Sequence, residues 1–108
     1  MKEYCYAKHE GQIIRIEFNT IRFIEGDRVY SRMFIDGGRH VLVRRTIKEL
    51  ESLLPGGRFI RIHKSYLVPL ARISWVSRYE VMLDCRTTLP IGGVFSTTMN
   101  TLVLENML

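Results

Sequence analysis

Short runs of alternating apolar and polar residues, separated by turn-forming residues about every 8–12 positions, constrain the fold of this chain most strongly. The clearest case is VYSRMFIDGGRHVLVRR, in which Asp36-Gly37-Gly38 separates two apolar-rich runs. Glycine at such a place supplies the positive φ that a tight hairpin turn requires. EYCYAKHEGQIIRIEF has the same form, with its turn near Glu10-Gly11. The pattern predicts a mainly β protein built from antiparallel hairpins.

Helical spacing occurs in only two places. Thr46 and Glu49 have the T-x-x-E form of a capping box, and the following leucines recur with helical period until Pro55-Gly56-Gly57. A second short helix is predicted after Phe95. The remaining predicted strands cover residues 21–26, 72–76, 79–84 and 87–93, and residues 59–70 begin as a further strand. We therefore expect one domain over residues 1–108, with several antiparallel strands and short helices.

Several classes of protein do not fit this sequence. No stretch approaches the roughly 20 apolar residues of a membrane span, and the first residues lack a signal-peptide pattern, so we expect a soluble, cytoplasmic protein. Cys5 and Cys85 are far apart, which favours free thiols in a reducing compartment over a disulfide or metal site. His9, His40 and His63 lack metal-ligand spacing, and no catalytic motif is present. We expect no enzyme activity, metal or cofactor.

The charge of the chain is basic. Sixteen Lys and Arg residues oppose eleven Asp and Glu residues, for a net charge of +5, and twelve of the sixteen are arginine. The planar guanidinium fits phosphate and guanine edges, so the excess suggests a polyanionic partner such as nucleic acid. Composition alone leaves open a moderately basic surface with no partner.

One run breaks the strand pattern. FIRIHKSYLVPL, residues 59–70, alternates at first, with Ile60 and Ile62 on one side, and then places Lys64 and Ser65 between apolar segments. A polar interruption held between two apolar anchors predicts a short turn directed away from the core.

The spacing F-x-R-x-H-K-S-Y-x-V after T-I-K-E-L-E-x-L-L resembles the LytTR DNA-binding domain of bacterial response regulators. IRFIEGDRVYSRMF is similar to an earlier segment of that family, and LPIGGVF to its closing P-[VI]-[SG] element. The resemblance covers roughly residues 4–102.

The resemblance implies a compact, antiparallel multi-sheet β fold with short helices. It implies binding to double-stranded promoter DNA, with loops in successive major grooves and paired direct repeats as sites. We expect a monomer in isolation and a dimer on DNA. The chain would be the output domain of a two-component regulator, either cut from a longer protein or standing alone, and the lack of a linker before Tyr4 favours the former. The alternative is a protein-interaction module that has kept the fold and lost specific DNA binding.

The resemblance places His63, Lys64 and Ser65 on a DNA-inserting loop. Lys64 can reach a phosphate or a guanine edge, and Ser65 can donate to a phosphate or cap its own turn. His63 either contacts phosphate or orients the loop through a backbone bond. Arg61, expected to point with His63, is either a phosphate clamp or one half of a surface ion pair.

A second loop would involve Arg28, Tyr30, Ser31 and Arg32. Under strand alternation Arg28, Tyr30 and Arg32 share one face and form a stripe that grips phosphate, unless they are simply exposed side chains.

At the third element this chain departs from the family. Many members have Ser-Arg where this chain has Gly92-Gly93, so an arginine that reads bases is absent. The N–H groups here, Gly93 included, either cradle a phosphate before the helix or form a plain turn. Arg44, Arg45 and Arg78 are further candidates for contact with phosphate, and their positions in the sequence alone do not decide whether they make one.

Overall fold

The computed structural model describes residues 3–108, and within them the chain forms ten strands, two α-helices and three short 3-10 turns. The strands are β1 (Tyr4–His9), β2 (Gln12–Glu17), β3 (Ile21–Asp27), β4 (Tyr30–Ile35), β5 (Arg39–Val43), β6 (Phe59–His63), β7 (Tyr66–Pro69), β8 (Ile73–Val76), β9 (Glu80–Leu83) and β10 (Thr88–Pro90). The helices are α1 (Ile47–Leu53) and α2 (Ser96–Glu105), and the 3-10 turns are η1 (Phe18–Thr20), η2 (Leu70–Arg72) and η3 (Gly93–Phe95).

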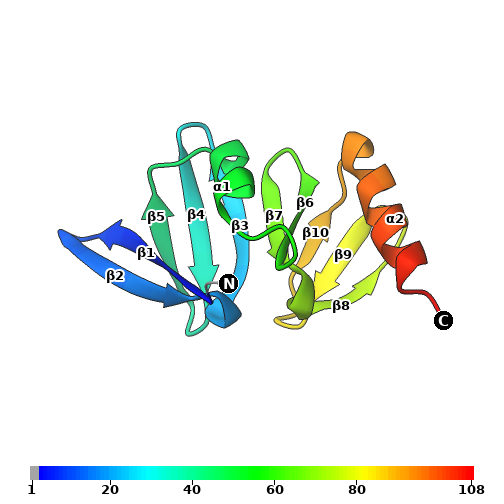
Figure 1. The fold of residues 1–108 in the computed structure, drawn as a ribbon, viewed down its shortest axis with the longest axis horizontal. Coiled ribbons are helices and arrows are strands. Elements are labelled where there is room, and N and C mark those ends of the chain that lie inside the picture. The colour runs from blue at the N-terminus through cyan, green and yellow to red at the C-terminus, as the bar shows by residue number, and fades with distance from the viewer. Residues whose placement is uncertain (1–2) are drawn as a thin grey trace.

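The strands form three antiparallel sheets. One is the β1-β2 hairpin, one has the order β5-β4-β3-β7-β6, and one has the order β10-β9-β8. Figure 1 shows the hairpin and the three-stranded sheet at opposite ends of the long dimension, with the five-stranded sheet between them. The prediction of a mainly β, antiparallel multi-sheet fold with short helices is confirmed. Gly37 lies at φ 91°, as its hairpin turn requires.

Helix α1 begins with the capping box that the sequence predicts. The Thr46 hydroxyl accepts from the Glu49 N–H at 3.1 Å, and the Glu49 carboxylate accepts from the Thr46 N–H at 3.0 Å. That backbone bond, together with the nearby Arg45 guanidinium, lowers the pKa of the Glu49 carboxyl. The helix buries Ile47 and Leu50, which fixes its start beside β3.

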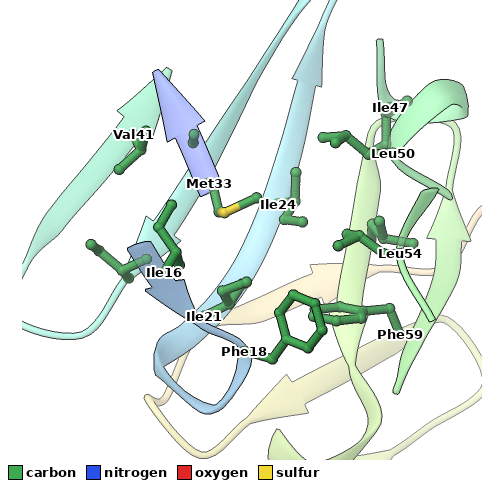
Figure 2. Packing of buried hydrophobic residues seen from close by; sticks show 13 residues of the cluster. Ile16, Phe18, Ile21, Ile24, Met33, Val41, Ile47, Leu50, Leu54 and Phe59 are labelled. Carbon is green, nitrogen blue, oxygen red and sulfur yellow. The ribbon is translucent and has the colours of Figure 1, made fainter. Parts of the chain in front are cut away.

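Two apolar cores lie on opposite faces of the central sheet. Figure 2 shows the first, which joins the hairpin, the sheet and α1 and contains Ile16, Phe18, Ile21, Ile24, Met33, Val41, Ile47, Leu50, Leu54 and Phe59. The second joins the sheet to β8–β10 and α2 and contains Phe23, Ile62, Val68, Val81, Leu83, Leu89 and Met99. Strands β3, β6 and β7 contribute to both cores. The turns that connect to these strands therefore begin from backbone that is packed on both sides.

Both cysteines are free and partly buried, as expected. Burial raises the pKa of the Cys5 thiol, which makes it a poor nucleophile. Within residues 3–108, no helix is long and apolar enough to cross a membrane. The same range holds no group of three His, Cys, Asp or Glu side chains placed to ligate a metal.

Candidate nucleic-acid interface

Three turns from distant parts of the sequence lie along one long side of the molecule, at the top in Figure 1, where the strands that they follow end. They are the β3–β4 turn, the β6–β7 turn and the Gly92-Gly93 segment between β10 and η3. The Gly26 N–H donates to the Ser65 carbonyl at 2.8 Å, and the Gly92 N–H donates to the Ile62 carbonyl at 2.8 Å. We call this region, residues 26–30, 63–65 and 92–93, the three-turn end.

Lys64 is exposed on the β6–β7 turn, and the residues beside it hold the turn in place. His63 Nδ1 accepts from the Ser65 N–H at 3.0 Å, which is the structural role considered for this histidine. Ser65 is partly buried, and its carbonyl is engaged by Gly26. Lys64 and Ser65, which interrupt the apolar pattern of the sequence, therefore form a hydrogen-bonded turn that exposes the Lys64 side chain to solvent.

Arg61 does not point into solvent beside His63. A register shift between these residues interrupts the alternation of β6, and the Arg61 side chain is only 14 % exposed. Its guanidinium pairs with Glu51 at 2.9 Å and donates to the carbonyls of His63 and Lys64 at 3.0 and 2.7 Å. Of the two roles predicted for Arg61, the structure places it in an ion pair; a phosphate clamp does not fit its burial.

The β3–β4 turn differs from the predicted stripe. Arg28 is exposed but lies in the two-residue turn, at φ 60°, so it does not share a strand face with Tyr30 and Arg32. A left-handed backbone costs a residue other than glycine roughly 1 kcal/mol. Arg32 is half-buried, 3.3 Å from the Asp27 carboxylate and 3.6 Å from that of Glu25. Among the described residues Arg28 therefore forms no ion pair, whereas Arg32 is paired with two carboxylates.

Ser31 corrects another expectation. It is fully buried, and its hydroxyl donates to the Arg45 carbonyl at 2.8 Å. It ties β4 to the segment before α1 and has no surface from which to contact DNA.

The glycine pair divides into two roles. A Cβ on Gly92 would lie 3.2 Å from the Phe95 ring and 3.4 Å from His63, so this residue allows the third segment to lie against the second. Gly93 is exposed, with nothing within 4 Å of its Cβ position. The Gly92 N–H is already engaged, which leaves only Gly93 of the pair for the predicted phosphate cradle. The predicted helix does follow, as η3 and α2.

The additional cations lie in exposed positions. Arg44 precedes α1, Arg45 pairs with Glu49 at 3.2 Å, and the Arg78 guanidinium lies 5.4 Å from the Tyr79 ring centroid.

Two residues that organise the site were not singled out from the sequence. Glu51 gave no signal, whereas Gly26, an isolated glycine inside a strand, is a recognised sign of close backbone approach.

Comparison with known proteins agrees with this architecture. The LytTr DNA-binding domain family matches residues 11–103. One solved structure, the LytTr DNA-binding domain of a Bacillus cereus protein described as a methyl-accepting/DNA response regulator, has a TM-score of 0.80 at 18 % identity. The similarity covers 95 % of this chain and 98 % of that one, and shows a shared fold. No curated protein sequence matches the chain. Because the family match spans residues 11–103, nearly the whole sequence, the chain belongs to the LytTR DNA-binding domain family.

Proposed function

We propose that the three-turn end binds double-stranded DNA sequence-specifically, with its turns inserted into successive major grooves. The observation that carries this proposal is the exposure of Lys64 on a turn that hydrogen bonds tie to the backbone of β3 and to the imidazole of His63. A turn already fixed in one conformation loses less entropy on binding than a mobile one. Family membership supplies the class of partner.

The charges at this end support the same proposal. Within residues 3–108, Arg28 and Lys64 at this end are exposed and form no ion pair, and the same holds for Arg44, which lies just before α1. Cations without an acidic partner are the ones that can neutralise phosphates and release counterions. The contact with bases falls to Lys64, since Gly93 has no side chain to offer.

The biological setting rests on the resemblance. We propose an output domain of a bacterial two-component transcriptional regulator that acts in the cytoplasm. It would be a monomer in isolation and would pair on direct repeats of DNA. No cofactor or metal enters the proposal.

Selection of binding sites from a random pool of double-stranded DNA tests it directly. We expect an enriched motif that is repeated at a fixed spacing. We also expect log K to fall by about 0.9 per unit of log salt concentration for each neutralised phosphate. A pool that yields no motif, with no salt-dependent binding, would instead favour a protein-interaction module.

A further inference from the structure

We propose that Arg61 is a positioning residue: its buried guanidinium holds the β6–β7 turn so that Lys64 is presented to DNA. This inference rests on the proposed function and assigns to Arg61 no contact with DNA. It concerns how the binding turn is kept in shape, and the first part of its test requires no DNA.

One guanidinium serves three acceptors. Arg61 donates to the Lys64 carbonyl at 2.7 Å, to the His63 carbonyl at 3.0 Å and to the Glu51 carboxylate at 2.9 Å. Both carbonyls belong to the turn residues, and the carboxylate belongs to α1. The arginine therefore fixes the turn backbone from the protein side and leaves the Lys64 side chain exposed.

The surroundings explain why an arginine is needed. The guanidinium presents several donors in a rigid planar fork, whereas a lysine ammonium is a point charge on a flexible stem. The Arg61 guanidinium carbon also lies 5.3 Å from the Phe95 ring centroid, a cation–π geometry that joins β6 to η3. A lysine could keep the charge but could not hold all of these partners.

The remaining bonds of the turn depend on its shape. The Ser65 N–H donates to His63 Nδ1, and the Ser65 carbonyl accepts from Gly26. If Arg61 releases the two carbonyls, these bonds are expected to open more often. The Ser65 and Gly26 amides thus report on the turn, independently of DNA.

Amide hydrogen exchange on the free protein is the first experiment. Arg61→Met should speed exchange at Ser65 and Gly26 while the β4 amides keep wild-type rates. Arg72→Met is the matched control, because Arg72 is also mostly buried, at 17 % side-chain exposure, and pairs with two carboxylates away from this turn. Glu51→Gln, which keeps both carbonyl bonds, should act in the same direction more weakly. The proposal is overturned if Ser65 exchanges at the wild-type rate in every folded Arg61 and Glu51 variant.

DNA binding supplies the second experiment, using the selected site. We expect Arg61→Met to weaken binding about tenfold, and Arg61→Lys to weaken it nearly as much although it keeps the charge. In the Lys64→Ala background, Arg61→Met should weaken binding by less than about threefold. The double variant should lose about 0.9 in salt slope relative to the wild type, whereas the loss of two phosphate contacts would lower the slope by about 1.8. Near wild-type binding by Arg61→Lys, or additive losses, would instead make Arg61 a direct phosphate contact. If Lys64→Ala has no effect on binding, the proposed function fails at this turn, while the exchange result still decides the role of Arg61.

Discussion

Two arginines at the two ends of the central sheet, Arg72 and Arg28, have different surroundings. At the end opposite the three turns, Arg72 in η2 pairs with Asp36 of the β4–β5 turn at 2.9 Å and with Asp84, just after β9, at 3.0 Å (Figure 1). There the guanidinium joins three segments and carries no net charge to the surface. At the three-turn end, Arg28 and Lys64 are exposed, and within the described residues neither has a carboxylate partner.

The difference shows that the number of arginines does not by itself measure a basic surface. Half of the twelve form ion pairs within residues 3–108: Arg15, Arg32, Arg45, Arg58, Arg61 and Arg72. The charge of these six is at least partly neutralised within the protein, whereas the other six have no acidic partner among the described residues. The comparison predicts that mutations at the three-turn end alter DNA binding, whereas matched mutations elsewhere alter stability or nothing.

The largest effect is expected where the three-turn end meets α1. A Cβ at Gly26 would lie 2.8 Å from the Ile47 Cβ, so Gly26→Ala must displace α1 from β3. Such overpacking costs about 1–3 kcal/mol in the free energy of unfolding. Gly93→Ala, at the same end but with open space around it, should change that free energy by less than about 0.5 kcal/mol. Denaturant unfolding of both variants measures the contrast, and equal values would mean that α1 does not pack closely there.

Lys64→Ala should have the largest effect on DNA binding among single exposed residues. We expect a loss of about tenfold in affinity for the selected site and a salt slope smaller by about 0.9, with unchanged unfolding free energy. Lys8→Ala is the matched control, since Lys8 is an exposed lysine on the β1–β2 hairpin. Fluorescence anisotropy titrations at several salt concentrations give both quantities. Equal losses for the two variants would attribute the effect to net charge alone.

Arg28→Gly should separate binding from stability. Arg28 and Arg86 both have left-handed backbones, at φ 60° and 64°, in turns at the two ends. Glycine removes this strain, so each variant should gain about 0.5–1 kcal/mol in unfolding free energy. Only Arg28→Gly should also lose affinity, by about threefold, because it removes a proposed phosphate contact. Thermal unfolding and anisotropy measured on both proteins test this; equal affinity losses would remove Arg28 from the interface.

These residues also show what the sequence could predict. The hairpins and α1 were predictable because their signals, Asp36-Gly37-Gly38 and the Thr46–Glu49 capping box, act between near neighbours. The grouping into three sheets was not, since it depends on the distant pairing of β3 with β7.

The errors at the site have the same origin. Alternation suggested that the Arg61 side chain points in the same direction as that of His63. A register shift inside β6 breaks this alternation, and the Arg61 side chain lies against the backbone of the β6–β7 turn instead. Ser31 was expected near DNA, yet its hydroxyl bond goes to the Arg45 carbonyl, fourteen positions along the chain. Lys64 was placed correctly at an exposed turn because its two apolar flanks are local. Side-chain contacts across elements are the information that the pattern lacks.

The smallest effect concerns the acids at the three-turn end. Asp27 lies 3.3 Å from the Arg32 guanidinium and would also repel phosphate, so Asp27→Asn should raise DNA affinity about two- to threefold. Because Asp27 is exposed, the gain should shrink as salt increases from 50 to 200 mM, roughly the range in which the Debye length falls below 10 Å. Asp36→Asn is the control, since it adds the same charge beside Arg72 at the opposite end. A gain confined to Asp27→Asn would show that the acid beside Arg32 opposes DNA binding at this end. Equal gains from both variants would show that only net charge matters, and Arg32 would then keep a purely structural role.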